Sequence, residues 1–312
     1  MGIDFPNVQG GILMADTANA NLFSRLHEIM PTLSKGHKKI AEYIMTRYDK
    51  AAFMTASKLG AITGVSESTV VRFATELGFD GYPELQRALK EYTSNKLTTV
   101  QRIDVMNDQL GGNDVYEKIL NMDIDHIRKT LEEGDREEFY RTVDTLCQAK
   151  NIYVIGARSA AVLARFLSFY FNMMFDSVKL VHTTSTSEMF EQILNIGEND
   201  IMIGISFPRY SRHTVQAFQY ASAQGAKVIA ITDSKASPLA AYADNILLAR
   251  SDMVSFADSL VAPMSVINAL IVAVGLRKSD YVIHNYERLE EIYDEYERGA
   301  PAGDVTPQSN DE

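Results

Sequence analysis

The chain has 312 residues and a formal net charge of −11, with 30 Lys and Arg against 41 Asp and Glu. This length leaves room for two domains of ordinary size, and no apolar run is long enough to span a bilayer. Because Cys147 is the single cysteine, the sequence excludes an intramolecular disulfide framework and a cysteine-cluster metal site. The N-terminus has no basic segment followed by an apolar one, so we expect a cytoplasmic protein without a secretory signal.

The stretch 57–78 has the pattern of two short helices joined by a tight turn. Ile62 is expected to face the core, and Gly60 is small enough to let a second backbone approach. Gly64 supplies the positive φ that such a turn requires. Ser66 is placed to cap the second helix, in which apolar residues recur at spacings of three and four and predict one buried face. These apolar residues are Val70, Phe73 and Leu77.

The opposite face of the second helix carries short polar side chains, which suit the major groove of DNA because base edges there offer donors and acceptors. An ordinary helical hairpin is the alternative that this pattern leaves open. Residues 31–99 contain ten Lys and Arg against seven Asp and Glu, so this segment is mildly basic within an acidic chain. The candidate DNA-contacting residues are Ser57, Ser66, Glu67, Ser68, Thr69 and Arg72, together with Lys35, Lys38 and Lys39. For each lysine singly, a solvated helix face is the alternative.

The sequence around this stretch resembles the N-terminal domain of RpiR-type bacterial transcription regulators. The resemblance covers about residues 24–95 and is carried by Val65-Ser66, residues 68–73, Leu77-Gly78-Phe79, Gly81-Tyr82 and Glu84-Leu85. It implies a head that binds double-stranded DNA at an operator.

The rest of the chain divides by composition. Residues 1–20 carry few structural signals and are expected to form a flexible arm, so the helix-turn-helix domain is assigned to 21–97. The polar segment 98–113 ends in paired glycines and is expected to be a linker. A second domain with flanking helices is assigned to 114–298, and a disordered tail to 299–312.

From Asn151 the pattern changes to apolar runs of four to seven residues, each followed by a helical pattern. This alternation predicts an open, mainly parallel sheet with helices on both faces, and hence a multidomain protein with an all-α head and an α/β domain. A ligand of such a sheet lies beyond the carboxyl ends of the strands, often at helix N-termini. Three expected strand ends carry hydroxyls and two of them also carry arginines, a combination that suits an anion. The candidates are Ser159, Ser185, Ser187, Ser206, Arg209 and Ser211, each serine having a simple helix cap as its alternative.

Residues from about 139 to 270 look like a sugar isomerase (SIS) domain, a phosphosugar-binding fold, on the segments IYVIGARS, ISFPRYSRHTV and GAKVIAITDSKASPLA. SIS domains usually carry Ser-x-Ser-Gly-x-Thr at a strand end, where this chain has SFPRYS over 206–211. Pro208 removes an N–H donor and Arg209 replaces a permissive glycine, so we expect a different phosphate loop. The resemblance implies an anionic, sugar-like effector, phosphorylated or not, and a homodimer or homotetramer.

An SIS-type sugar-phosphate isomerase is the alternative function. Such isomerases use a glutamate at the start of a helix after a late strand, and the comparable region here has only Asp252 and Asp258. Glu188 and His213 are the remaining candidate bases near the predicted site. The segment after Gly156 lacks the further glycines of a dinucleotide fingerprint, and the histidines form no ligand-spaced pair, so we expect no cofactor and no metal. The sequence therefore favours an effector-controlled DNA-binding regulator over an enzyme.

Overall fold

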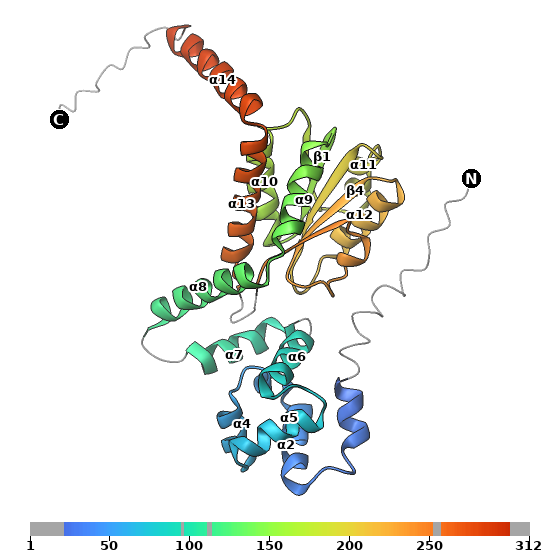
Figure 1. The fold of residues 1–312 in the computed structure, drawn as a ribbon, viewed down its shortest axis with the longest axis vertical. Coiled ribbons are helices and arrows are strands. Elements are labelled where there is room, and N and C mark those ends of the chain that lie inside the picture. The colour runs from blue at the N-terminus through green and yellow to red at the C-terminus, as the bar shows by residue number, and fades with distance from the viewer. Residues whose placement is uncertain (1–21, 95–96, 111–113, 252–256, 300–312) are drawn as a thin grey trace, which may run out of the picture.

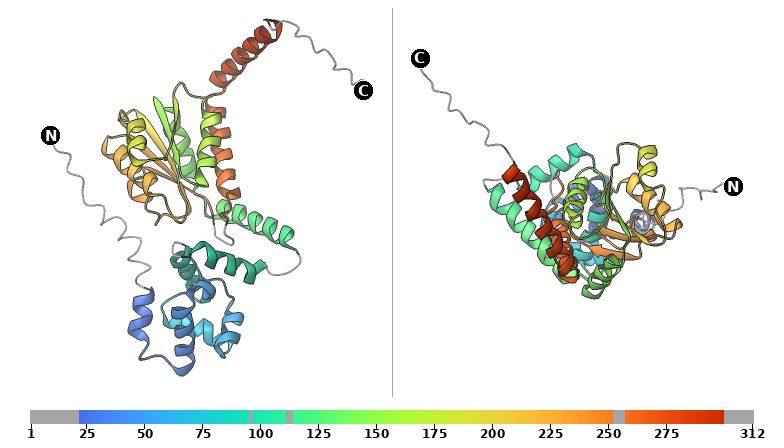
Figure 2. Two further views of the ribbon diagram at one scale, coloured as in Figure 1. Left: turned by 180° about the vertical axis from the view of Figure 1, so that it is seen from behind. Right: turned by 90° about the horizontal axis from the view of Figure 1, so that it is seen from above.

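The computed structural model describes residues 22–94, 97–110, 114–251 and 257–299. Figure 1 shows a helical part below and an α/β part above, with the helices over 99–110 and 115–133 between them, and Figure 2 shows the same division from behind. The predicted arm over 1–20 and residues 300–312 of the predicted tail lie outside the described residues.

The helical part, called the head below, is a bundle around one apolar core. Leu26, Ile40, Phe73 and Leu85 come from four different helices and are fully buried in this core. The buried Tyr82 hydroxyl donates to the carbonyl of Met54 at 2.7 Å. The helices of the head span 22–29, α2 (Lys35–Thr46), α3 (Tyr48–Ala51), α4 (Ala56–Thr63), α5 (Glu67–Glu76) and α6 (Tyr82–Ser94).

Helices α4 and α5 form the predicted helix-turn-helix. Gly64 ends α4 with φ 67°, and Ser66 caps α5 by accepting the N–H of Thr69, as the sequence predicts. Gly60 lies so close to α5 that an added Cβ would come within 2.8 Å of the carbonyl oxygen of Val65. The close approach of the two helices therefore depends on this glycine.

The prediction that Ile62 faces the core is wrong, because its side chain is 48% exposed. Thr63 is buried in its place and donates its hydroxyl to the carbonyl of Leu59 at 2.8 Å. Leu59 and Thr63 are four residues apart and share one face of the helix, whereas Ile62 projects from another. A threonine can take the buried position since its hydroxyl is satisfied within the helix.

The segment predicted as a linker contains a helix, α7 (Thr99–Leu110), between the head and the α/β part (Figure 1). Val105 of α7 and the preceding Leu97 are buried in a small cluster against Tyr48 and Phe53 of the head. The sequence does not predict this helix, because the segment is largely polar and its buried apolar side chain packs against residues that are distant in the sequence. Helix α7 is therefore packed on the head rather than loose.

The α/β part contains one five-stranded, wholly parallel sheet in the order β2-β1-β3-β4-β5. Its strands are β1 (Asn151–Gly156), β2 (Val178–Val181), β3 (Asp200–Ile205), β4 (Lys227–Thr232) and β5 (Asn245–Leu248). Its helices are α8 (Val115–Glu133), α9 (Arg136–Cys147), α10 (Ala160–Phe171), α11 (Thr186–Ile193), α12 (Arg212–Ala223), α13 (Val261–Arg277) and α14 (Ser279–Gly299), with a short 3₁₀ turn at Ala240–Tyr242. This confirms the predicted α/β class with helices on both faces.

The strands alternate their buried side chains between two cores. One core packs β-strand residues against α9, α10 and α13, and the other packs them against α11 and α12. On the second face, Gly204 of β3 lies directly beneath the buried ring of Phe218 of α12. Buried strands of this kind produce continuous apolar runs in the sequence, which is why the sheet could be predicted.

Glu138 ties α9 to the edge strand β5. Its carboxylate accepts the N–H of Ile246 at 2.9 Å and the amide of Asn245 at 3.0 Å, and pairs with Arg141. Burial raises the pKa of Glu138, but the hydrogen bonds from Arg141, Ile246 and Asn245 outweigh burial, so its pKa lies below the ordinary glutamate value.

Helices α13 and α14 meet at an angle of 93°, so that α14 extends away from the sheet (Figure 1). No single helix among the described residues is long and apolar enough to cross a membrane, although this bent pair passes that test by length and composition together.

Candidate DNA-binding face and effector site

The N-terminal turn of α5 presents a cluster of hydroxyl groups at the surface of the head. The Ser66 hydroxyl lies 2.9 Å from that of Ser68 and 2.8 Å from that of Thr69. Ser66, Glu67 and Ser68 are exposed, and Thr69 is half-buried. The exposed Arg72 lies one turn further and donates from Nε to the Ser68 carbonyl at 3.3 Å. Five of the candidate DNA-contacting residues thus lie at the N-cap and in the first two turns of α5.

The start of α2 lies beside this turn. A Cβ added to Gly36 would be 3.5 Å from Val65 and 3.6 Å from Thr69, so the two helix N-termini are in contact. His37 Nδ1 is 2.5 Å from a carboxylate oxygen of Glu76, which joins α2 to α5. The lysines of this end of α2 therefore flank the hydroxyl cluster. Among the candidates, Lys35, Lys39 and Ser57 are exposed and Lys38 is half-buried.

The strand order places the second candidate site between β1 and β3. The chain first runs from β1 outward to β2, and then returns to the other side of β1 for β3, β4 and β5. At such a reversal the loops that follow the two central strands diverge and leave a crevice at the carboxyl edge of the sheet. The loop after β1 ends at Ser159, and the loop after β3 spans 206–211.

The loop after β3 is held by its own serines. The buried Ser206 hydroxyl accepts the N–H of Ser211 at 3.1 Å, and the Ser211 hydroxyl caps α12 by accepting the N–H of Thr214 at 3.4 Å. Arg209 has φ 69°, a left-handed conformation that a glycine would adopt without strain. The arginine therefore keeps a glycine-like backbone conformation and adds a cation to the loop.

Arg209 belongs to a cluster that the sequence did not predict. Its Nη2 donates to Asp258 Oδ2 at 3.0 Å, and Arg102 Nη1 of α7 donates to Asp258 Oδ1 at 3.1 Å. The Ser159 hydroxyl lies 3.5 Å from Asp258 Oδ2. Two guanidinium groups thus share one carboxylate at the strand reversal. We call Arg102, Arg209 and Asp258 the coupling cluster.

The remaining predicted effector residues lie one strand away, after β2. Ser185 caps α11 by accepting the N–H of Glu188 at 3.2 Å, and Ser187 is exposed in the first turn of that helix. The Thr186 hydroxyl lies 3.2 Å from His213 Nε2 of α12, which brings the β2 and β3 loops together. Ser159, Ser206, Arg209 and Ser211 gather at the strand reversal, while Ser185 and Ser187 line its β2 side.

No local pattern in the sequence indicates a role for Arg102, which lies 156 residues from Asp258. Asp258 is a sequence candidate only as a substitute base. Asp252, the other such candidate, lies outside the described residues. The residues next to Arg102 predict neither its position nor its partner, since the sequence of α7 has the composition of a polar linker.

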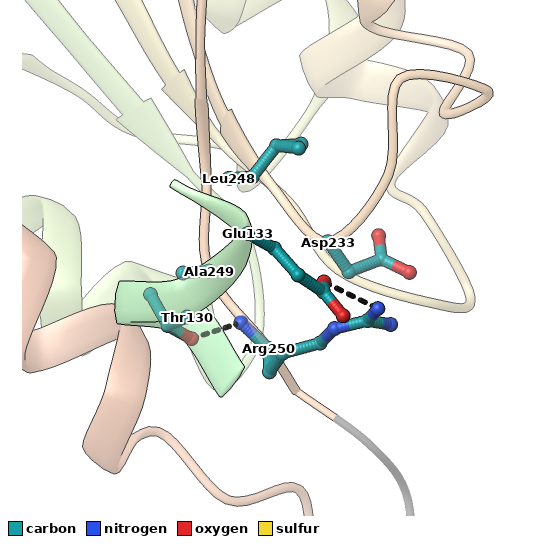
Figure 3. Close-up of a pocket in the computed structure, with 6 residues that line it drawn as sticks. All are labelled: Thr130, Glu133, Asp233, Leu248, Ala249 and Arg250. Atoms are coloured by element: carbon teal, nitrogen blue, oxygen red, sulfur yellow. Dashed lines mark hydrogen bonds and ion pairs between the residues drawn. The ribbon is translucent and has the colours of Figure 1, made fainter. Parts of the chain in front are cut away.

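A shallow hollow lies at the carboxyl ends of β4 and β5 (Figure 3). Figure 3 shows Arg250 crossing it to Glu133 of α8, while the Arg250 N–H donates to the Thr130 hydroxyl at 2.9 Å. These side chains fill the hollow, which leaves no room for a sugar phosphate. Among the residues that the structure describes, no group of three His, Cys, Asp or Glu side chains could hold a metal ion.

Comparison with known proteins identifies both parts. The helix-turn-helix domain of the rpiR family matches residues 20–96, and the SIS domain matches residues 145–273. The transcriptional regulator HexR of Escherichia coli strain K12 is 27% identical over 284 residues, which cover 88% of this chain and 95% of HexR.

Two solved structures resemble the chain. The sugar isomerase domain of an RpiR transcription factor from Sphaerobacter thermophilus has a TM-score of 0.55 and 26% identity, covering 57% of this chain and 99% of that domain. The NanR protein of Vibrio vulnificus has a TM-score of 0.54 and 22% identity, covers 88% of this chain and 98% of NanR, and supports the two-part fold. The chain belongs to the RpiR-type transcriptional regulators, in which an rpiR-family helix-turn-helix domain precedes a SIS domain.

Proposed function

We propose that this chain is a DNA-binding transcriptional regulator whose SIS domain binds an anionic, sugar-like effector that changes its affinity for an operator. The observation that carries the proposal is the combination of an exposed, groove-compatible helix turn on the head with an arginine-bearing strand reversal in the second domain. The proposal places the protein in the cytoplasm, where it has access to DNA. The boundaries 21–97 and 114–298 remain our prediction for its two domains.

On the DNA side, α5 would enter the major groove with Ser66, Ser68, Thr69 and Arg72 toward base edges and nearby phosphates. The hydroxyls and an arginine can each make hydrogen bonds there. The lysines at the start of α2 flank this turn and would contact the phosphate backbone. Candidate contacts also include Ser57 and Glu67, which are exposed on the same helix pair.

On the effector side, the three loops offer hydroxyls, helix N-termini and Arg209, all of which suit phosphate or carboxylate oxygens. A sugar phosphate is the first class to test, because NanR of Vibrio vulnificus was solved in complex with ManNAc-6P. The proposed contacts are Ser159, Ser185, Ser187, Ser206, Arg209 and Ser211.

Self-association would match a two-fold symmetric operator with half-sites about 10 bp apart or a multiple of that spacing. Helix α8 supports this part of the proposal with a stripe of exposed apolar side chains at helical spacing, which a second copy of the chain would cover. The stripe consists of Tyr116, Leu120, Ile124, Ile127 and Leu131.

Isomerase activity is less well supported. Glu188 accepts a hydrogen bond from Thr184, and His213 contacts Thr186, so both candidate bases have structural partners. The named relatives are regulators. We therefore propose that the chain is not an enzyme, and sugar-phosphate turnover by the purified protein would contradict this.

The experiment is a band shift with DNA from upstream of its own gene, at fixed salt. Arg72→Ala should weaken binding by about 1–3 kcal/mol if the arginine reads a base. Arg136→Gln is the matched control because Arg136 is exposed in the first turn of α9, in the α/β part. Equal affinity of Arg72→Ala and the parent would refute the assignment of the DNA-binding face.

The effector is sought by thermal shift of the full chain against hexose phosphates, N-acetylhexosamine phosphates and sugar acids, since a ligand raises the unfolding temperature by mass action. Arg209→Ala should abolish the shift while leaving DNA binding in place. A shift that is unchanged in Arg209→Ala would exclude this loop as the effector site.

A further inference from the structure

The coupling cluster joins the strand reversal of the SIS domain to a helix that lies outside that domain. Arg102 is in α7, its side chain is 1% exposed, and its ion pair is with Asp258. Burying a guanidinium group costs free energy unless an opposite charge compensates it. The position of the Arg102 side chain is therefore fixed by the position of Asp258. Arg102 and Arg209 lie close to each other because both donate to Asp258, and burial, followed by the charge of Arg209, lowers the pKa of Arg102.

Asp258 is positioned by the SIS domain. The adjoining Ser259 donates to Asp123 of α8 at 2.6 Å, and its carbonyl accepts the hydroxyl of Ser251 at 3.1 Å. Two residues beyond Ser259, α13 begins. The carboxylate is therefore fixed to the α/β part, while the arginine it holds belongs to α7.

Helix α7 in turn is packed on the head. Val105 and Leu97 are 3% and 4% exposed, and they lie against Tyr48 and Phe53. Tyr48 belongs to α3, which is followed along the chain by the helix-turn-helix. A contact chain thus runs from Arg209 through Asp258 and Arg102 to the head.

We propose that the coupling cluster transmits effector binding to the head: an anionic group bound at Arg209 competes with Asp258 for both arginines, and so loosens α7 from the SIS domain. This inference depends on the proposed function for the identity of the site and of its output. It adds that Arg102, a residue outside the SIS domain, carries the regulation.

Charge balance makes the device selective for anions. Two guanidinium groups and one carboxylate leave the cluster with a net charge of +1. A bound phosphate brings a second acceptor for the same donors and repels Asp258, whereas a neutral sugar does neither. The effector must therefore be charged at the end that meets Arg209.

The test is hydrogen–deuterium exchange of the α7 backbone amides in the full chain. In Asp258→Asn and Arg102→Gln these amides should exchange about 5- to 30-fold faster than in the parent, because the ion pair is lost. Arg102→Lys keeps the charge and should show a smaller increase. Arg136→Gln, which changes an exposed arginine of α9, should leave α7 exchange unchanged.

Inorganic phosphate is the probe for competition, against sodium chloride at the same ionic strength. Phosphate should accelerate α7 exchange in the parent and have no further effect in Asp258→Asn. No acceleration in the parent, or the same α7 exchange in Asp258→Asn as in the parent, overturns the proposal. Arg209→Ala, a half-exposed position, provides a variant that keeps the Arg102–Asp258 pair and should lose only the phosphate effect.

The band shift separates this inference from the proposed function. Arg102→Gln and Asp258→Asn should change operator affinity about 5- to 150-fold in the same direction, and the double variant should add nothing further. If the parent does not bind DNA, the proposed function is refuted, while the hydrogen–deuterium exchange result still tests whether the cluster couples the effector site to α7. If the parent binds and responds to phosphate but Arg102→Gln responds equally, the coupling fails alone.

Discussion

Gly60→Ala is expected to separate the two helices of the helix-turn-helix. The added Cβ would lie 2.8 Å from the carbonyl oxygen of Val65 and 3.4 Å from the N–H nitrogen of Glu67. Both neighbours are backbone atoms of the turn into α5, so they cannot give way as a flexible side chain could. Helix α5 must therefore shift by several tenths of an ångström.

The magnitude follows from two opposed contributions. Replacing a glycine within a helix by alanine gains about 1 kcal/mol of helix propensity. Overpacking by one methyl group costs about 1–3 kcal/mol. We expect a net loss of about 1 kcal/mol, which corresponds to roughly fivefold faster exchange of the buried amides of α5.

Hydrogen–deuterium exchange of the full chain measures this loss, and Gly36→Ala is the matched control. A Cβ on Gly36 meets only ordinary contacts at 3.5 and 3.6 Å, so this second substitution should be neutral or stabilise the head by about 0.5 kcal/mol. Slower α5 exchange in Gly60→Ala than in Gly36→Ala would refute the argument. A weaker band shift for Gly60→Ala is expected as well, since its recognition helix is displaced.

Three further substitutions test other parts of the molecule. Gly204→Ala would place a Cβ 2.0 Å from the buried ring of Phe218, so it should destabilise the SIS domain by about 1–3 kcal/mol; an unchanged calorimetric transition would contradict this packing. Ser66→Ala removes the cap of α5 and should cost the head about 1 kcal/mol, measured by exchange of the first α5 amides. Glu138 has a lowered pKa in the folded protein, so its stabilising contribution is present above its unfolded pKa and is lost as the pH falls through the folded pKa. Glu138→Gln should therefore lower the unfolding temperature at pH 7 and narrow its difference from the parent toward pH 3, and a constant difference would count against this role.

The head and the sheet could be predicted from the sequence because their signals are local. A turn glycine, a capping serine and apolar residues at spacings of three and four define α4 and α5 within twenty residues. The short apolar runs of the second part similarly indicate a buried parallel sheet. Even in the head, hydrophobicity alone wrongly predicts that Ile62 is buried, because the geometry of the helix places Thr63 at the buried position.

The coupling cluster and α7 could not be predicted in this way. Helix α7 owes its burial to Tyr48 and Phe53, which precede it by about fifty residues, and Arg102 owes its position to a carboxylate near α13. Contacts between residues that are far apart in the chain produce no periodic pattern in the sequence. The candidate effector serines stay a prediction, and two of them, Ser185 and Ser211, make the helix-capping bonds that the alternative expects.

The left-handed backbone of Arg209 has a consequence for any attempt to improve this protein by selection. A glycine would relieve the conformational strain there, of the order of 1 kcal/mol, so a search for heat-resistant variants should favour Arg209→Gly. Under the proposed role of Arg209, such a variant would have a higher unfolding temperature and would lose its response to the effector. The φ angle of Arg209 therefore links two properties, because the substitution that raises thermal stability there is expected to remove the response to the effector.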